Sequence, residues 1–190
     1  VVFIPKDVSS LELVEPTNQI LMTDSAEIDG KNGLRLHDMY VNVTKSDVFN
    51  TIKYDTDKNM ISVSSDTKLD GQPSMNVSLM DNGDAYLTAV SDKDAIPDFY
   101  NSLGLSELYV SPEVLQTTID GCPAYVYHAQ YTDSENGFVN TNYFAYIMLS
   151  ESSFAKAVIS SMVDPGVDVV LTDSYANSMF SQITVVKGDD

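Results

Sequence analysis

Apolar and polar residues alternate most regularly between Val114 and Leu149, where three β-prone runs follow one another. The first run ends at the Gly121 turn, and the polar loop Thr132–Gly137 separates the second from the third, Phe138–Leu149. Alternating runs joined by turn residues are typical of antiparallel strands. The pattern therefore predicts a three-stranded antiparallel meander.

The last run of this meander changes character along its length. Its first half alternates between polar and apolar residues, whereas both faces are apolar from Tyr143 to Leu149. A strand that is apolar on both faces is covered on both faces. We therefore expect this strand to lie at the centre of a sheet, with helices on at least one side.

Turn residues predict two hairpins upstream of the meander. Asp55–Asn59 lies between β-prone residues 51–54 and 60–64, and such turn residues favour a hairpin. Asn82-Gly83 is a strong hairpin signal and predicts strands over 75–80 and 85–90.

Helical spacing of apolar residues predicts three helices. The first begins at a cap residue, Asp94, carries a proline in its first turn and ends at Gly104. The second is capped by Ser150 and ends at Asp164-Pro165-Gly166, and the third is capped by Asp173. A short strand over Thr184–Val186 is expected to close the fold.

These elements together predict an α+β fold. A chain of 190 residues suits one domain. We expect a central antiparallel β-sheet, the meander, with about three helices packed on its faces over residues 33–190. Residues 1–32 have the weakest pattern and are predicted to be an irregular or edge-strand segment.

The net charge of the chain limits the kinds of molecule that it is expected to bind. The chain has 28 acidic and 10 basic residues, a formal net charge of −18, and no run of basic residues. Nucleic acids and anionic lipids are bound through clustered Lys and Arg. We therefore expect that this chain does not bind nucleic acid. The sequence has no apolar run near 18 residues, and we expect no transmembrane segment.

A polar, acidic surface correlates with export. We therefore expect an extracytoplasmic protein, secreted or anchored at the cell surface, whose start at Val1 without Met suggests processing or truncation.

The order of elements resembles the PsbP-like fold, which a photosystem II extrinsic protein shares with many bacterial lipoproteins. The resemblance rests on "TTIDGCPAYVYHAQY", "NYFAYIML" and "SYANSMFSQITVV" and covers roughly residues 40–186. It implies an accessory or binding protein without a shared active site, so it assigns no functional residue.

One turn resembles the start of a calcium-binding loop. Asp55, Asp57 and Asn59 match the first three ligand positions, and Asp66 falls at the twelfth. The sixth position is Met60 rather than Gly, and a hairpin turn explains the same residues. The metal-site hypothesis is therefore Asp55, Asp57 and Asn59 with weakly bound calcium, and otherwise no cofactor is expected.

The sequence contains few residues that could form a catalytic site. Cys122 and His128 lie six residues apart along one predicted strand, about 20 Å by strand rise, so they do not form a nucleophile–base pair unless the strand breaks. Cys122 is the only cysteine, which excludes an intramolecular disulfide. No nucleophile, phosphate-loop or zinc-protease motif occurs.

Tyrosine supplies the best candidate surface. Tyr125, Tyr127 and Tyr131 lie on one face of the middle strand of the meander. Aligned rings form a platform for a sugar ring or a partner protein, unless a helix covers them as part of the core.

The function predicted from the sequence is a non-enzymatic extracytoplasmic domain, of the kind found in lipoproteins, that binds a partner protein or a small ligand. One alternative is a calcium-binding module that uses the Asp55–Asn59 turn. Another is a hydrolase whose residues come from separate strands.

Overall fold

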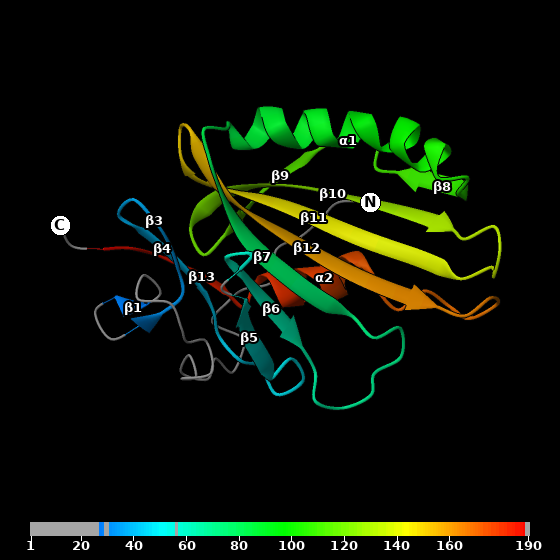
Figure 1. Cartoon of the computed structure of the whole chain (residues 1–190), viewed down its shortest axis with the longest axis horizontal. Coiled ribbons are helices and arrows are strands. Elements are labelled where there is room, and N and C mark those ends of the chain that lie inside the picture. The colour runs from blue at the N-terminus through cyan, green and yellow to red at the C-terminus, as the bar shows by residue number, and fades with distance from the viewer. Residues whose placement is uncertain (1–26, 29–30, 56, 189–190) are drawn as a thin grey trace.

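The computed structural model describes residues 27–28, 31–55 and 57–188. Thirteen strands and two helices are present within these residues, and β-structure dominates (Figure 1). In chain order the elements are β1 (Glu27–Ile28), β2 (Lys31–Asn32), β3 (Leu34–Leu36), β4 (Met39–Val43), β5 (Thr51–Asp55), β6 (Met60–Ser64), β7 (Ser74–Asp81), α1 (Ala85–Ser102), β8 (Ser106–Val110), β9 (Leu115–Ile119), β10 (Cys122–Thr132), β11 (Val139–Ser150), β12 (Ser153–Val163), α2 (Asp173–Phe180) and β13 (Ile183–Lys187).

A large antiparallel sheet forms the body of the molecule. Its strand order is β5-β6-β7-β12-β11-β10-β8, and β9 pairs with the other end of β10. The pairing of β9 with β10 and of β10 with β11 confirms the predicted meander. The pairing of β5 with β6 confirms the hairpin at Asp55–Asn59.

Both faces of the large sheet are covered along β11, as its sequence predicts. Ala145 and Ile147 point into the main core, which α2 and the small sheet close on one side. The intervening Tyr146 points to the opposite face, where it packs in a second core beneath α1. Figure 1 shows α1 running across β10 and β11 on one side of the sheet and α2 on the other.

The small sheet and α2 complete the main core. The small sheet has the order β13-β4-β3, and β13 confirms the predicted closing strand. The third predicted helix is also confirmed, although its cap is Thr172, whose hydroxyl accepts the Tyr175 amide at 3.2 Å. Buried Met179 and Phe180 of α2 face the core.

The predicted second helix is wrong, because residues 153–163 form strand β12. This strand pairs with β11 on one side and β7 on the other. Ala155, Ala157 and Ile159 point into the main core and are fully buried. Phe154 on the opposite face is also buried, beneath α1. Apolar residues on both faces concealed the two-residue period and imitated helical spacing.

The predicted hairpin at Asn82-Gly83 is wrong as well, although its first strand, 75–80, is confirmed as β7. Residues 85–90 are the first turns of α1, which therefore begins nine residues before the predicted cap at Asp94. The Asp84 carboxylate caps the helix by accepting the Leu87 amide at 2.8 Å. The proline that was expected in the first turn, Pro97, lies well inside the helix.

The predicted fold class needs correction in consequence. A central sheet with three helices does not describe a chain whose described residues form two helices, one large sheet, a separate three-stranded sheet and the β1–β2 pair. The class is mostly β. Of the predicted N-terminal segment 1–32, residues 27–28 and 31–32 form the β1–β2 pair, and the remainder lies outside the described residues.

Candidate functional site

The tyrosine face of β10 lies beneath α1. The Tyr125 ring centroid is 5.2 Å from that of Tyr86, and the Tyr131 centroid is 4.7 Å from that of Tyr100, both on α1. Tyr127 between them is 3% exposed. The sequence correctly placed the three tyrosines on one face, and the structure uses that face to hold α1. A ligand-binding role for Tyr125, Tyr127 and Tyr131 stays a prediction.

A chain of polar contacts runs from the surface into this second core. The Tyr146 hydroxyl donates to Oδ2 of Asp92 on α1 at 2.6 Å and lies 3.0 Å from the Tyr127 hydroxyl. Lys156 Nζ lies 3.6 Å from the same Asp92 oxygen. Burial and the Asp92 carboxylate raise the pKa of Tyr146, and burial raises that of Tyr127, so both phenols stay neutral donors. The chain of contacts fixes the middle of α1 on the sheet.

The Asp55–Asn59 turn uses its polar atoms internally. Asp55 Oδ1 accepts the amides of Asp57 at 3.0 Å and Lys58 at 3.1 Å, and Asn59 Oδ1 accepts the Tyr54 hydroxyl. Within the described residues no group of three His, Cys, Asp or Glu side chains is arranged to hold a metal ion. Calcium binding by Asp55, Asp57 and Asn59 stays a prediction.

Cys122 and His128 lie on one unbroken strand, β10. Burial and nearby Asp120 raise the pKa of the half-buried Cys122 thiol, which keeps it protonated. His128 Nδ1 lies 3.0 Å from Ser111 Oγ, and the same Oγ accepts the His128 backbone amide at 2.8 Å. Ser111 is thus engaged with the backbone of β10 and is 8% exposed.

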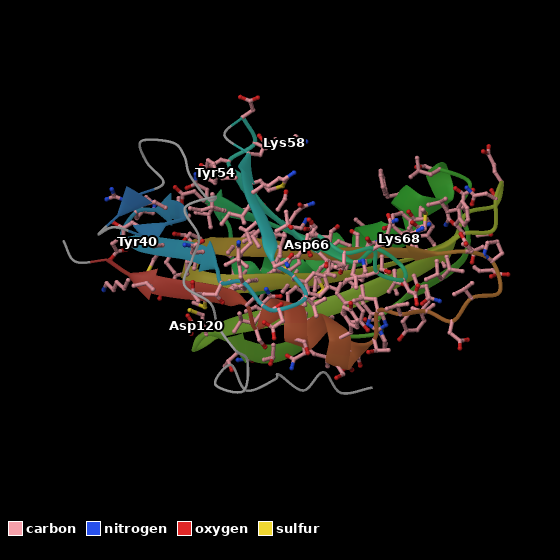
Figure 2. The ribbon with its side chains drawn as sticks, turned by 90° about the horizontal axis from the view of Figure 1, so that it is seen from below. Tyr40, Tyr54, Lys58, Asp66, Lys68 and Asp120 are labelled. Carbon is pink, nitrogen blue, oxygen red and sulfur yellow. The ribbon has the colours of Figure 1, made fainter. Side chains whose placement is uncertain are left out.

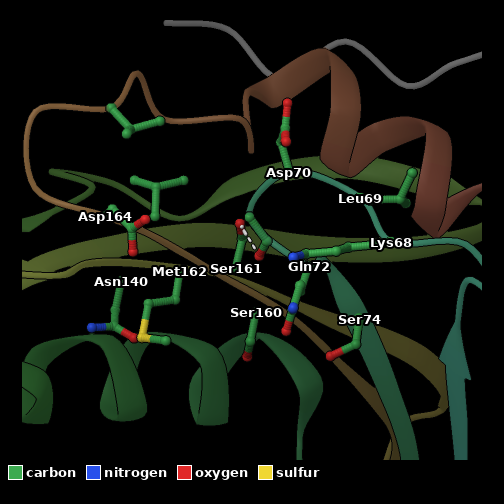
Figure 3. A pocket seen from close by; sticks show the side chains of 13 residues that line it. Lys68, Leu69, Asp70, Gln72, Ser74, Asn140, Ser160, Ser161, Met162 and Asp164 are labelled. Carbon is green, nitrogen blue, oxygen red and sulfur yellow. Dashed lines mark hydrogen bonds between the residues drawn. The ribbon is translucent and has the colours of Figure 1, made fainter.

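The structure also contains a cleft that the sequence did not indicate, here called the polar cleft (Figure 3). It has a volume of about 610 Å³ and lies between the loop before β7, the end of β12 and the turn that follows β12. Its lining is mainly polar and consists of Lys68, Leu69, Asp70, Gly71, Gln72, Ser74, Asn140, Ser160, Ser161, Met162, Val163, Asp164 and Val167.

A glycine fixes one wall of the polar cleft. The Gly71 carbonyl accepts the Met162 amide at 3.0 Å and the Ser161 hydroxyl at 2.9 Å, which ties the loop to β12. Gly71 has φ of +71°, and a Cβ there would lie 2.5 Å from Ser161 Oγ. A side chain at this position is therefore disfavoured on two grounds.

Strand register builds the floor of the polar cleft. Ser74 of β7 lies opposite Ser160 of β12, and Met162 of β12 lies opposite Asn140 of β11. The Ser160 hydroxyl donates to Asn142 Oδ1 at 2.8 Å. Met162 beside this row is 51% exposed and supplies an apolar surface. The floor thus offers small hydroxyl and amide groups next to one flexible apolar side chain.

Sequence reasoning missed this site because it predicted β12 as a helix. Ser160 and Met162 share a face with Asn140 and Asn142 only when residues 153–163 form a strand next to β11. A two-residue period was present along 153–163, where small residues stand at 155, 157 and 161. This period favours a strand and could have indicated the site.

Comparison with known proteins leaves the family open. No protein-family model matches the chain. No curated protein matches it either. The chain is similar in structure to LpqN of Mycobacterium tuberculosis, described as involved in cell envelope biogenesis, with a TM-score of 0.48 and 12% identity over 77% of this chain and 83% of that one. No functional conclusion follows from a likeness of this extent, and the resemblance to the PsbP-like fold stays a prediction. No helix within the described residues is long and apolar enough to cross a membrane.

Proposed function

We propose that this chain is a non-enzymatic binding module whose polar cleft takes a small, uncharged ligand rich in hydroxyl or amide groups. The observation that carries the proposal is the polar lining of a cleft of about 610 Å³. This volume lies within the range of about 300–1,000 Å³ that is usual for ligand sites. Most such sites are mainly apolar, so a lining of Ser, Asn and Gln favours a polar ligand.

Hydrogen bonding supports this choice of ligand. Ser74, Gln72 and Asn140 each carry groups that both donate and accept hydrogen bonds. The charged side chains of the lining, Lys68, Asp70 and Asp164, include both signs, so no strong single charge selects an ion. A neutral ligand that both donates and accepts fits this set best.

The test is a titration followed by NMR. Simple sugars, polyols and primary amides are added to the ¹⁵N-labelled chain, and shifts of the amides of Gly71, Gln72 and Ser160 are expected. Ser160→Arg, which fills the floor, is expected to abolish these shifts. The matched control is Asn76→Arg, because Asn76 is exposed on the same sheet face and lies outside the cleft.

Melting temperatures of both variants establish that they remain folded. The proposal fails if no compound shifts the cleft amides, or if Ser160→Arg and Asn76→Arg weaken binding equally. Saturable binding of a whole protein, with no small ligand, would favour a partner-protein module instead.

We also propose an extracytoplasmic location, which rests on the acidic, polar composition. The gene sequence upstream of Val1 tests it. A secretory leader, with or without a lipid-modified cysteine at its end, is the expected result. An initiator Met directly before Val1 contradicts it.

A further inference from the structure

Four of the ten basic residues of this acidic chain fall in one stretch of sequence on and around the β5–β6 hairpin. Between residues 45 and 68 the sequence has four basic and four acidic residues, against 10 and 28 in the whole chain. The four lysines are Lys45, Lys53, Lys58 and Lys68, and they lie on or beside the β5–β6 hairpin. Figure 2 shows Lys58 near the projecting end of the hairpin, and Asp66 and Lys68 nearer the body of the molecule. This stretch of the chain is therefore locally neutral.

These four lysines differ in their pairing from three other lysines that the structure describes. Lys93, Lys156 and Lys187 each lie within 4 Å of a carboxylate, at 3.2, 3.6 and 3.8 Å. Within the part of the chain that the structure describes, none of the four lysines at the β5–β6 edge forms an ion pair. In a chain with nearly three carboxylates for each base, unpaired lysines gathered in one place are available to an external anion.

Two of the four lysines line one cleft, here called the lysine cleft. It has a volume of about 400 Å³ and is lined by Lys45, Asn50, Thr51, Ile52, Lys53 and Asp66. Asn50 Oδ1 accepts the Asp66 amide at 3.1 Å and the Thr51 hydroxyl at 3.4 Å. The oxygen of the Asn50 amide is thus occupied, and its nitrogen is the group that remains to donate.

The donors of the lysine cleft form a set suited to an oxyanion. Two ammonium groups and one amide nitrogen donate hydrogen bonds, and charge-assisted bonds of this kind are the strong ones. Asp66 is the single carboxylate of the lining, and it makes no ion pair with Lys45 or Lys53 within the described residues.

Protection of a sheet edge explains part of this arrangement. A lysine on an edge strand discourages pairing with other chains, and exposed Lys53 on β5 does this. Lys45 precedes the strand and is half-buried, so edge protection does not account for it. Lys45 has no carboxylate partner within the described residues, so its ammonium is available to an external anion.

We propose that the lysine cleft binds an anionic oxygen group, a carboxylate or a phosphate, of a ligand or partner. The ligand's anionic group lies between Lys45 and Lys53 and accepts from the Asn50 amide. The site is separate from the polar cleft, so it stands or falls independently of the proposed function.

Screening determines the conditions of the test. At low ionic strength the total charge of −18 repels anions over tens of ångströms. At about 0.15 M salt the screening length falls to about 8 Å, so distant carboxylates lose influence while the two lysines of the cleft keep theirs. Binding is therefore measured at 150 mM sodium chloride.

The experiment titrates inorganic phosphate and, in a second arm, citrate into the ¹⁵N-labelled chain. Saturable shifts at the amides of Asn50 to Lys53 are expected in at least one arm, and the tighter arm tells phosphate from carboxylate. The double variant Lys45→Gln/Lys53→Gln is expected to weaken binding by about two- to fivefold for each lysine, as for exposed ion pairs. Lys58→Gln/Lys187→Gln removes the same charge outside the cleft and is expected to leave binding unchanged.

The variant Asp66→Asn is expected to change anion affinity in the opposite direction from the lysine variants. Loss of this carboxylate is expected to tighten binding of the anion, because it removes repulsion and keeps the backbone contact with Asn50. A calcium site that included Asp66 would respond in the reverse direction, with weaker cation binding.

Three outcomes overturn the proposal. One is the absence of saturable shifts in both arms. Another is an equal loss of affinity in the two double variants, which indicates general electrostatics. The third is weaker anion binding by Asp66→Asn.

Discussion

His128 shows how one side chain acquires properties that its position in the sequence does not reveal. Its ring lies between those of Tyr109, at 5.3 Å, and Tyr143, at 4.6 Å. Burial lowers the pKa of His128 from its usual 6.5, although nearby Asp173 opposes the shift. The folded state therefore binds a proton less readily than the unfolded state.

This pKa shift predicts the pH dependence of stability. The stabilising effect of neutral His128 is complete above the unfolded value of 6.5 and is lost as pH falls below it toward the folded pKa. Chemical denaturation between pH 7.5 and 5.5 is expected to show falling stability. His128→Gln is expected to reduce that slope, whereas His37→Gln, at a side chain that is 67% exposed, is expected to keep it. Equal slopes in the wild type and His128→Gln would contradict the prediction.

Asp55 provides a second residue-scale prediction. Because its Oδ1 accepts two backbone amides, Asp55→Ala is expected to destabilise the chain by about 1 kcal/mol. Asp57→Ala removes the same charge and leaves the turn bonds in place, so a smaller effect is expected. Both are measured by denaturation with calcium and with a chelator. The calcium-loop hypothesis requires instead that both variants lose a stabilisation which calcium gives to the wild type.

At the scale of elements, α1 begins at a different residue from the one that the sequence predicts. Asp84 caps the helix, and Asp94, the predicted cap, lies inside it beside Lys93. Asp84→Ala is expected to cost about 1 kcal/mol, as N-cap replacements do. Asp94→Ala is expected to change stability by less than about 0.5 kcal/mol, as exposed helix positions do. Thermal or chemical denaturation of the two variants decides, and the reverse order of effects would place the helix start at Asp94.

The elements also show which local signals survive in the fold. The β5–β6 turn, the β9–β11 meander and α2 are set by short-range chemistry, and each was predictable. Residues 85–90 and 153–163 were not, because their apolar residues fit two periods. The contact of Phe154 with α1, together with pairing of β12 to β7 and β11, decides between them.

For the whole molecule, net charge predicts a dependence on salt. Self-repulsion at −18 opposes the compact state, and screening relieves it. Raising sodium chloride from 10 to 150 mM is expected to stabilise the chain by on the order of 1 kcal/mol, or roughly 2–4 °C in Tm. Differential scanning calorimetry at pH 7 measures this shift. An unchanged or lower Tm would mean that local ion pairs outweigh the overall repulsion.

The sequence alone determined the features that depend on neighbouring residues or on composition. These are the meander, the β5–β6 hairpin, the closing α2–β13 unit, the double-sided burial of β11 and the acidic surface. Turn residues, caps and alternation act over a few positions, so their signal is present in the chain itself.

Tertiary structure alone decided the rest. It placed α1 over Tyr125, Tyr127 and Tyr131, made residues 153–163 a strand, and so created the polar cleft. It also brought Lys45 beside Lys53 and Asp66. These features depend on contacts between residues far apart in the chain. Local patterns do not specify which distant face covers a strand or closes a cleft. For this reason the strand at 153–163 and the two clefts were not predicted, and the sequence left open whether a helix covers the three tyrosines.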